Sequence, residues 1–357
     1  MMRPIMIMAG GTGGHVYPAL AVADELRARG VPVIWLGTRK GIEAKLVTEA
    51  GFPIDWLGVS GLRGKGIVSL LMAPVNLLMA CYQVTRILLK RKPCVVLGMG
   101  GFVSGPGGLM AKLLKMPLLI HEQNAIPGLT NRLLSQIANK VMEAFPHSFK
   151  EDAIHVGNPV RRSIASLPSP EQRFKNRQGA LRLLVFGGSL GAARLNEIVP
   201  QALSKIESDQ RPLVRHQAGV KNIEQTLSNY KAMNIKAEVS AYIDDMADAY
   251  SWADVVLCRS GAMTVAELAA AGVASVLVPY PHAVDDHQTA NAKYLSNENA
   301  AILIQQNELT PDSLLNILNS LSRGKALEMA NKARRLGMPE STRLVTEQCL
   351  MEGGVLC

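Results

Sequence analysis

The amino-acid sequence predicts an α/β protein made of two similar halves, each with a parallel β-sheet covered by helices. Its 357 residues correspond to about two ordinary domains, and 48% of them are hydrophobic, which is enough to fill two cores. Short apolar strands alternate with glycine-rich turns and helices, as is typical of parallel α/β units. The pattern restarts near residue 181. We therefore expect two Rossmann-like domains with a ligand-binding cleft between them.

The first half contains a series of short apolar segments that are predicted strands: residues 4–8, 31–36, 95–98 and 118–121. The glycine turn at residues 10–14 follows the first strand and leads into a helix over residues 17–29, where apolar side chains recur at helical spacing. Gly30 is suited to end this helix.

The second half repeats the pattern after a VGNPV segment at residues 156–160 and a Ser-, Pro- and Arg-rich stretch at residues 166–179. Its predicted strands are residues 181–186, 255–258 and 276–279. Two turns each lead into a helix: residues 187–191 before 192–205, and residues 260–261 before 263–271. The two halves are therefore a weak structural duplication.

Positive charge is concentrated in the first half. The net charge is +9, yet residues 1–150 hold 17 lysines and arginines against 7 acidic residues, whereas residues 151–357 hold 21 against 22. A nucleic-acid site would need aromatic side chains interleaved with the basic ones, and none are. We therefore expect no nucleic-acid partner and favour an anionic membrane surface as the partner of the first half.

Cysteine usage and the N-terminus indicate the compartment. The five cysteines are scattered and show no C-x-x-C spacing, so neither a disulfide framework nor a zinc cluster is expected. The N-terminal MMRPIMIMAGG has an apolar run too short for a signal peptide and leads straight into the glycine turn. These features predict a reducing, cytoplasmic compartment.

The first glycine turn, GGTGGH at residues 10–15, is a candidate anion site. Its glycines let backbone N–H groups approach an anion, and the N-terminus of the helix adds positive potential. A tight turn without a ligand is the simpler alternative. A dinucleotide-binding site is a second alternative. Val16 stands where that motif has a small residue, and no acidic residue ends the second strand, which disfavours NAD; Arg39 leaves NADP open.

Two more glycine segments occur. FGGSLGA at residues 186–192 is of the same type, in the second half, and a cluster spans residues 98–108 in the first half. Three such loops converging on one cleft would fit two phosphorylated ligands better than one.

The most specific stretch is CRSGAMTVAE at residues 258–267. A strand ends, Ser-Gly makes a turn, and a helix begins near Met263, so free N–H groups would face a diphosphate. Glu267 lies one turn into the helix, where its carboxylate can accept hydrogen bonds from a ribose diol. The alternative is a capped helix in which Glu267 only complements the helix dipole.

Several stretches together carry a family resemblance: MAGGTGGHVYPALAVA, VSGLRGKG, LGMGGFVSGPGG, HEQNAIPGLTN, VGNPVR, GGSLGA, YIDDMADAYSWADVVLCRSGAMTVAE and VPYPHAVDDHQTANA. Over nearly its full length the chain resembles the MurG family, the UDP-N-acetylglucosamine transferases of peptidoglycan synthesis. The resemblance implies the GT-B fold. It implies an acceptor and membrane domain over residues 1–158, a donor domain over residues 159–339, and a C-terminal helix, residues 340–357, packed back on the first domain.

The resemblance also implies the residues that bind the donor. Thr12, Gly13 and Gly14 border the sugar, Asn124 and Gln288 contact N-acetylglucosamine, Arg161 is a basic donor contact, Ser189 lies near the phosphates, Ile243 contacts uracil, and Ala262, Met263, Thr264, Val265, Ala266 and Glu267 match the diphosphate and ribose segment. Leu190 departs from the family pattern, which often has glutamine there, so any hydrogen bond from that side chain is lost.

The implied reaction moves N-acetylglucosamine from UDP to the C4 hydroxyl of the muramyl sugar of lipid I and gives lipid II, with inversion of the anomeric centre. Such a displacement needs a base for the acceptor hydroxyl and stabilisation of the departing UDP. We expect His15 to be the base because imidazole titrates near neutral pH. Glu122 is the second candidate, as a base or as a partner of His15 or of the substrate. A helix-capping or substrate-binding role is the alternative for His15.

Neither a metal nor a cofactor is expected. The chain has no Asp-x-Asp motif of the kind that holds a metal against a sugar diphosphate. The pairs Asp244-Asp245 and Asp285-Asp286 are adjacent in sequence, and such side chains diverge on regular backbone, so they make weak metal sites.

A membrane-facing segment is predicted at residues 67–82, IVSLLMAPVNLLMACY. Its 16 residues fall short of the roughly 20 that span a bilayer. Basic residues surround it and a second apolar pair: Arg63, Lys65, Arg86, Lys90, Arg91, Lys92, Lys112 and Lys115. This pattern favours peripheral attachment at the cytoplasmic face of the inner membrane, and a buried core helix is the alternative. The implied partners are UDP-N-acetylglucosamine, lipid I, this membrane surface and other cell-wall synthesis proteins.

Two other function classes remain open. A UDP-sugar epimerase of the same architecture would need the donor alone, and the residue 98–108 loop and the basic first half argue against it. A non-catalytic lipid-binding subunit would not need the donor segment at residues 258–267.

Overall fold

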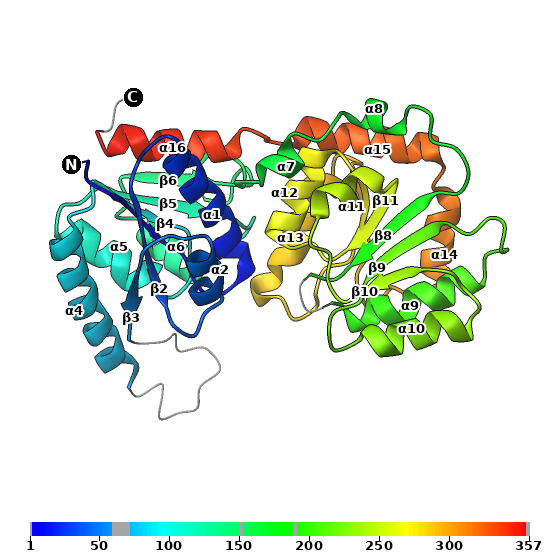
Figure 1. Ribbon diagram of the computed structural model, residues 1–357, viewed down its shortest axis with the longest axis horizontal. Coiled ribbons are helices and arrows are strands. Elements are labelled where there is room, and N and C mark those ends of the chain that lie inside the picture. The colour runs from blue at the N-terminus through cyan, green and yellow to red at the C-terminus, as the bar shows by residue number, and fades with distance from the viewer. Residues whose placement is uncertain (1, 59–71, 150–152, 189–190, 355–357) are drawn as a thin grey trace. The chain divides into compact units, whose positions relative to one another are not determined.

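The computed structural model describes residues 2–58, 72–149, 153–188 and 191–354. The chain divides into two compact units: Met1–Val160 together with Glu340–Cys357, and Arg161–Pro339. Each unit has its own parallel sheet (Figure 1). Each also has its own hydrophobic core.

The first unit contains a seven-stranded sheet in the order β3-β2-β1-β4-β5-β6-β7, in which all neighbouring strands are parallel. The strands are β1 (Ile5–Met8), β2 (Val33–Thr38), β3 (Ile54–Leu57), β4 (Val95–Gly98), β5 (Leu118–Glu122), β6 (Lys140–Glu143) and β7 (Ile154–His155). The sequence predicts four of them. It misses β3, β6 and β7 because these outer strands are short, partly exposed and interrupted by charged or polar residues.

Helices cover both faces of this sheet (Figure 1). One face carries α1 (Gly13–Ala28) and α16 (Ser341–Glu352), with α2 (Glu43–Glu49) beside α1; the other carries α4 (Ala73–Arg91) and α5 (Ser104–Leu113), with α6 (Leu129–Leu134) beside α5. Successive side chains of a strand point to opposite faces. Ile5 and Ile7 therefore pack on the α1 and α16 side, whereas Met6 and Met8 pack on the α4 and α5 side.

Helix α1 begins at Gly13, four residues before the predicted start. The sequence predicts a later start because Gly13 and Gly14 are poor helix formers. Pro18 lies inside the helix and has no N–H to donate to a preceding carbonyl oxygen.

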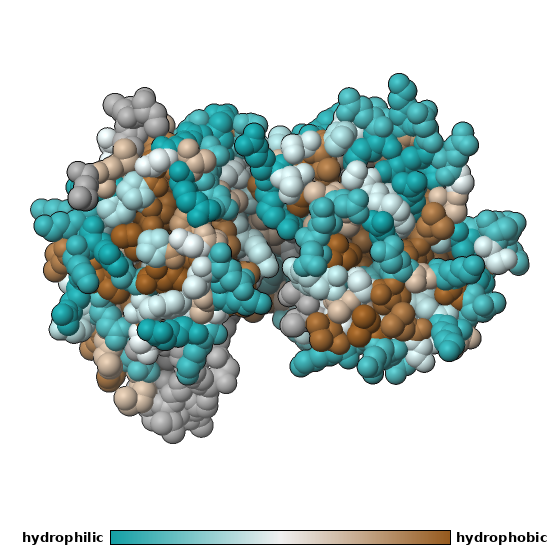
Figure 2. Space-filling model, in the orientation of Figure 1, coloured by the Kyte–Doolittle hydropathy of each residue, from teal (hydrophilic) through white to brown (hydrophobic). Residues whose placement is uncertain are grey.

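The outer face of α4 presents large apolar side chains to the surface. Ala80, Val84 and Leu88 form the buried side of this helix, whereas Leu78 and Tyr82 are 71% and 64% exposed. Figure 2 shows apolar side chains at the surface over α4 among hydrophilic ones. The helix is thus neither a wholly buried core helix nor a polar surface helix. No helix in the described parts of the chain is long and apolar enough to cross a membrane.

The second unit contains a six-stranded parallel sheet in the order β10-β9-β8-β11-β12-β13. The strands are β8 (Arg182–Phe186), β9 (Leu213–Gln217), β10 (Glu238–Ser240), β11 (Val255–Cys258), β12 (Ala274–Leu277) and β13 (Ala301–Leu303). Strand β12 begins two residues before its predicted start because the small Ala274 and Ser275 pair with Val255 and Val256. It ends before Pro279, which lacks the N–H that a ladder requires.

The helices of the second unit follow the strands in the expected alternation. They are α7 (Arg162–Ala165), α8 (Pro170–Phe174), α9 (Ala193–Ser204), α10 (Ile223–Ala232), α11 (Met246–Trp252), α12 (Ala262–Ala271), the 3₁₀ turn η1 (Val284–Asp286), α13 (His287–Ser296), α14 (Pro311–Ser320) and α15 (Arg323–Leu336). The predicted helices over residues 192–205 and 263–271 correspond to α9 and α12. Both follow strands at the centre of the sheet, β8 and β11, where the strand order reverses.

Candidate active site

The first glycine turn connects β1 to α1 beside the position where the strand order of the first sheet reverses. Thr12 is the N-cap of α1, and its carbonyl oxygen accepts hydrogen bonds from the N–H groups of His15 (3.1 Å) and Val16 (3.2 Å). The N–H groups in the first turn of a helix lack an acceptor within the helix and attract anions. Gly13 and Gly14 occupy this turn, so no side chain obstructs it.

Glu43, the buried first residue of α2, contacts this glycine turn, and the sequence-based interpretation misses it. Its carboxylate accepts hydrogen bonds from the N–H of Gly11 (3.0 Å) and from the N–H and hydroxyl of Thr38 (3.0 and 2.7 Å). It therefore ties the glycine turn to the end of β2. A Cβ at Gly41 would lie 1.9 Å from a Glu43 oxygen, so the glycine in front of α2 makes room for the carboxylate.

The third glycine segment packs directly against the first. Met99 donates its N–H to the carbonyl oxygen of Met8 (2.8 Å), and the Ser104 hydroxyl donates to the same oxygen (3.0 Å). A Cβ at Gly101 would lie 2.3 Å from the carbonyl oxygen of Gly10. The structure thus brings together two of the three glycine segments, both within the first unit.

Strand β5 brings polar side chains to both faces of the sheet. His121 and Gln123 point to the α1 face and Glu122 to the opposite one, since neighbouring side chains alternate. Nδ1 of His15 lies 2.9 Å from Oε1 of Gln123. The partner of His15 is therefore Gln123 and not Glu122. Gln123 is a site residue that the sequence-based interpretation misses, although its alternation with His121 in the HEQN run could have found it.

Glu122 is 2% exposed and holds the loop that follows β5. Its Oε1 accepts hydrogen bonds from the backbone N–H (2.9 Å) and side-chain amide (3.2 Å) of Asn124. Its Oε2 accepts from the N–H of Gly128 (3.1 Å) and the side-chain amide of Asn131 (2.9 Å). Four donors therefore converge on this carboxylate, which sets the position of Asn124.

In the second unit, Arg161 and Glu267 form an ion pair at 3.1 Å. The second oxygen of Glu267 accepts a hydrogen bond from the hydroxyl of Tyr250, also at 3.1 Å. Burial raises the pKa of Glu267, and the charge and hydrogen bond of Arg161 together with the hydrogen bond of Tyr250 work against this rise. Tyr250 is fully buried and is another site residue that the sequence gives no signal for.

Helix α12 begins directly after β11, with Gly261 as its N-cap. Of the predicted donor residues in this helix, Ala262 and Val265 are buried, whereas Met263, Thr264 and Ala266 are half-buried. The side chain of Val265 is fully buried. The first turn of the helix therefore offers a ligand mainly its backbone N–H groups.

The remaining predicted residues lie on other segments of the second unit. Ile243 is half-buried in the loop between β10 and α11. Gln288 is the second residue of α13, and its Oε1 accepts a hydrogen bond from the N–H of Tyr280 at 2.9 Å. Ser189 and Leu190 lie outside the described residues.

No group of three or more His, Cys, Asp and Glu side chains within the described residues is arranged to hold a metal ion. Asp285 and Asp286, one of the two adjacent pairs, both lie within η1 and have left-handed backbone conformations.

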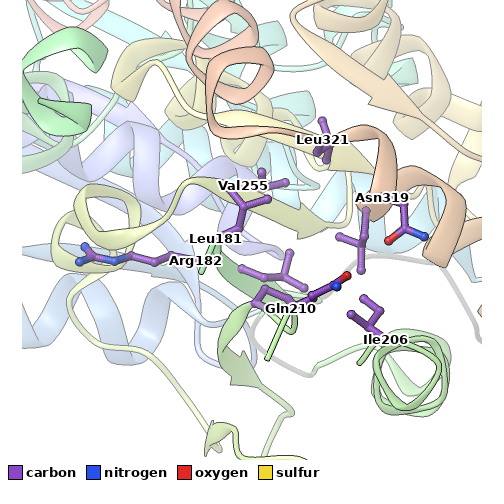
Figure 3. A pocket seen from close by; sticks show the side chains of 10 residues that line it. Leu181, Arg182, Ile206, Gln210, Val255, Asn319 and Leu321 are labelled. Atoms are coloured by element: carbon purple, nitrogen blue, oxygen red, sulfur yellow. The ribbon is translucent and has the colours of Figure 1, made fainter. Parts of the chain in front are cut away.

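A pocket of about 180 Å³ opens at the amino ends of β8 and β11 (Figure 3). Arg182 and Val255, the first residues of these strands, line it together with Ile206 and Leu321. The candidate donor segments follow the carboxyl ends of the same strands. The pocket therefore lies at the opposite edge of the sheet and is not part of the candidate active site.

Both units match known glycosyltransferase domains. Residues 5–143 match the glycosyltransferase family 28 N-terminal domain, and residues 182–344 match the glycosyltransferase family 28 C-terminal domain. A protein of Dechloromonas aromatica named UDP-N-acetylglucosamine--N-acetylmuramyl-(pentapeptide) pyrophosphoryl-undecaprenol N-acetylglucosamine transferase is 52% identical over 349 residues, 98% of this chain and 99% of the relative. The chain belongs to this family of transferases. A family member from Nitrosomonas europaea is 53% identical over 352 residues, 98% of this chain and 99% of the relative.

Solved structures agree with membership of the family. The crystal structure of Acinetobacter baumannii MurG matches with a TM-score of 0.87 and 42% identity, over 98% of this chain and 99% of that one. A UDP-GlcNAc 2-epimerase from Neisseria meningitidis matches with a TM-score of 0.67 but only 13% identity, over 98% of this chain and 100% of that one, which is a likeness of fold alone. The predicted MurG family, GT-B fold and glycosyltransferase activity are confirmed.

Proposed function

We propose that the chain transfers N-acetylglucosamine from UDP to the C4 hydroxyl of the muramyl sugar in lipid I, the undecaprenyl-diphosphate-linked muramyl pentapeptide. The products are lipid II and UDP, and the anomeric centre inverts. The observation that carries this proposal is identity at about half of all positions, over nearly the full chain, to relatives whose names state this transfer.

His15 is the proposed base. It takes the proton of the acceptor hydroxyl as that oxygen attacks the anomeric carbon and the bond to UDP breaks, with the electron pair leaving on the diphosphate. Its half-buried place in the first turn of α1 and its hydrogen bond to Gln123 support this role. Glu122 is the weaker candidate, because it would have to give up some of its four hydrogen bonds before it could take a proton.

The donor is proposed to bind through the residues that the resemblance implies. The N-terminal turn of α12 and Arg161 offset the charge of the diphosphate, and Glu267 accepts hydrogen bonds from the ribose diol. Further proposed contacts surround these groups: Thr12, Gly13, Gly14, Asn124, Ser189, Ile243 and Gln288. The ion pair of Arg161 with Glu267 supports the proposal, because it gathers two of these side chains at the edge of the sheet from which α12 starts.

The lipid-linked acceptor is proposed to be met at an anionic membrane surface, on the cytoplasmic face. The exposed apolar side chains of α4 and Leu113 of α5, which is 64% exposed, support this proposal. Lys90, Lys92, Lys112 and Lys115 supply positive charge along or just after these helices. Arg91 is not counted among the residues that contact the membrane, because it forms a bidentate ion pair with Asp55 at 2.8 and 2.9 Å.

One assay separates transfer from the two alternatives. Radiolabelled UDP-N-acetylglucosamine is incubated with a lipid I analogue, and labelled lipid is the expected product. A His15→Gln variant is expected to lower kcat by about 100- to 10,000-fold, the usual contribution of a general base. An epimerised sugar without labelled lipid would support an epimerase instead. If neither product formed, a non-catalytic binding role would be supported.

A further inference from the structure

A chain of hydrogen bonds connects His15 to two backbone carbonyl groups in the interior of the first unit. Nδ1 of His15 lies 2.9 Å from Oε1 of Gln123. Nε2 of Gln123 lies 3.0 Å from both Nδ1 and the carbonyl oxygen of His121. Nε2 of His121 lies 2.9 Å from the carbonyl oxygen of Gly157. His121 and Gln123 have no solvent exposure, whereas His15 is half-buried.

The carbonyl oxygen of His121 determines the orientation of the Gln123 amide. A backbone carbonyl can only accept hydrogen bonds, so the amide atom facing it must be the NH₂ nitrogen. The same NH₂ group donates its second proton to Nδ1 of His121. Oε1 of Gln123 is therefore the atom that faces His15, and this assignment does not depend on the protonation of either histidine.

The protonation of His121 follows in the same way. The carbonyl oxygen of Gly157 requires a proton on Nε2 of His121, and the NH₂ group of Gln123 requires a lone pair on Nδ1. Burial lowers the pKa of His121 to about 4, although the hydrogen bond to Gly157 acts in the other direction. The ring is thus neutral near pH 7 and presents one donor and one acceptor, as its two neighbours demand.

We propose that Gln123 and His121 are positioning residues that hold His15 in the tautomer with its proton on Nδ1, which leaves Nε2 as its basic nitrogen. Oε1 of Gln123 only accepts, so Nδ1 of His15 must donate. A neutral imidazole carries one lone-pair nitrogen, which is then Nε2. This inference rests on the proposed role of His15 as the base. The partner is an uncharged amide, which orients the ring without adding a negative charge beside it.

Gly100 leaves room for the same ring. A Cβ at this position would lie 2.7 Å from both Nδ1 and Cε1 of His15, closer than a carbon atom can approach without displacing the ring. Gly100 also has a φ of +96°, a conformation that favours glycine. The absence of a side chain at Gly100 therefore leaves the imidazole the space that it occupies beside the amide of Gln123.

The direct test is the tautomer of His15, read from long-range ¹H–¹⁵N correlation spectra of the full chain with ¹⁵N-labelled histidine. The His15 signals are assigned by their loss in His15→Gln. We expect the Nδ1–H tautomer in the unsubstituted protein and a mixture of tautomers in Gln123→Met, which has similar size but no hydrogen-bonding amide. An Nε2–H tautomer in the unsubstituted protein, or an unchanged His15 in Gln123→Met, would overturn the proposal.

Steady-state kinetics provide the second readout. Gln123→Met is expected to lower kcat by about 10- to 100-fold, as the loss of an outer orienting group commonly does, with little change in KM for UDP-N-acetylglucosamine. Gln123→Glu keeps an acceptor for Nδ1 of His15 but places a carboxylate oxygen against the carbonyl oxygen of His121, so its kcat is expected to fall as well. A loss confined to KM in Gln123→Met contradicts a positioning role.

A control separates orientation from stability. Thr346→Val removes a buried hydroxyl from α16 in the same unit, where it donates to the carbonyl oxygen of Thr342 at 2.8 Å. It is expected to leave kcat and the His15 tautomer unchanged. The spectra also distinguish this proposal from the proposed function: if His15 shows the Nδ1–H tautomer but His15→Gln remains fully active, the positioning is right and the assignment of the base is wrong.

Discussion

At the scale of single residues, Glu267 is a carboxylate held by two donors before any ligand arrives. Arg161 donates to Oε1 and Tyr250 donates to Oε2, each at 3.1 Å. Burial, together with the negative charge of Glu267, raises the pKa of Tyr250, so its hydroxyl keeps its proton and remains a donor. Tyr250 therefore fixes the orientation of the Glu267 carboxylate. The lone pairs that remain free on this carboxylate are the ones to which a ribose diol would donate.

Tyr250→Phe removes this donor without changing the size of the ring. The hydrogen bond to a charged group contributes about 1.5–3 kcal/mol, so KM for UDP-N-acetylglucosamine is expected to rise by roughly 10- to 100-fold. The discriminating measurement is the ratio of kcat/KM for the ribose donor and its 2′-deoxyribose analogue. The variant is expected to show a smaller preference for the ribose donor. The 2′-deoxy analogue lacks one of the hydroxyls that donate to Glu267, so its binding depends less on how Glu267 is oriented.

Tyr230→Phe is the matched control for this substitution. Tyr230 is also a buried tyrosine of the second unit, and its hydroxyl lies 2.9 Å from Nδ1 of His216. This variant removes a buried hydroxyl at a site with no proposed donor contact and should keep the preference for ribose. Equal losses toward both donors in Tyr250→Phe would show that its role is structural only.

At the scale of elements, the sequence predicts what depends on local pattern. The buried central strands and the glycine turns after them appear as apolar runs and glycine clusters. Contacts that depend on the fold are not visible in this way. Glu43 meets Gly11 across 32 positions of the chain and Tyr250 meets Glu267 across 17, and no local pattern marks either residue. Gln123 is the intermediate case, because the alternation of β5 alone places it beside His121.

The structure shows which basic residues at the end of α4 can be substituted to test membrane binding. The sequence groups Arg91 with its neighbours as a basic cluster, but its guanidinium is engaged by Asp55, and the hydrogen bond to that carboxylate raises the pKa of Arg91. Reversing its charge would therefore disturb the packing of α4 against β3 as well as any membrane contact. Lys90 and Lys92 flank Arg91 and are the residues to change instead.

Lys90→Glu/Lys92→Glu is expected to weaken binding of the protein to vesicles that contain anionic lipid. Each lysine near such a surface contributes about 1 kcal/mol, so removing two attractions lowers the affinity by roughly 30-fold at low salt, and the added repulsion lowers it further. Binding is measured by co-sedimentation at several salt concentrations. Lys231→Glu/Lys236→Glu makes the same change in net charge on the second unit and should bind nearly as the unsubstituted protein does. Unchanged binding of the first variant would refute attachment through α4.

At the scale of the whole molecule, the first unit is built from two separate parts of the sequence. Helix α16 follows the entire second unit, yet it packs on α1 and β4. Val345 and Cys349 are fully buried in the core that α1 and β1 also form. The hydroxyl of Thr342 donates to the carbonyl oxygen of Val160, which joins the start of α16 to the end of the preceding part of the unit. The last helix thus completes the unit that holds His15.

Leu350→Ala tests whether α16 stabilises the first unit specifically. Leu350 is 6% exposed within the core of that unit, and a leucine-to-alanine change in a core costs about 2–5 kcal/mol. Amides of β1 and β4 are therefore expected to exchange with deuterium roughly 30- to 5,000-fold faster, whereas those of β8 and β11 keep their protection. Leu227→Ala, at a 45% exposed position on α10, should alter neither set. Equal acceleration in both sheets would mean that the two units unfold as one cooperative body, and the separate cores would then not act as separate units of stability.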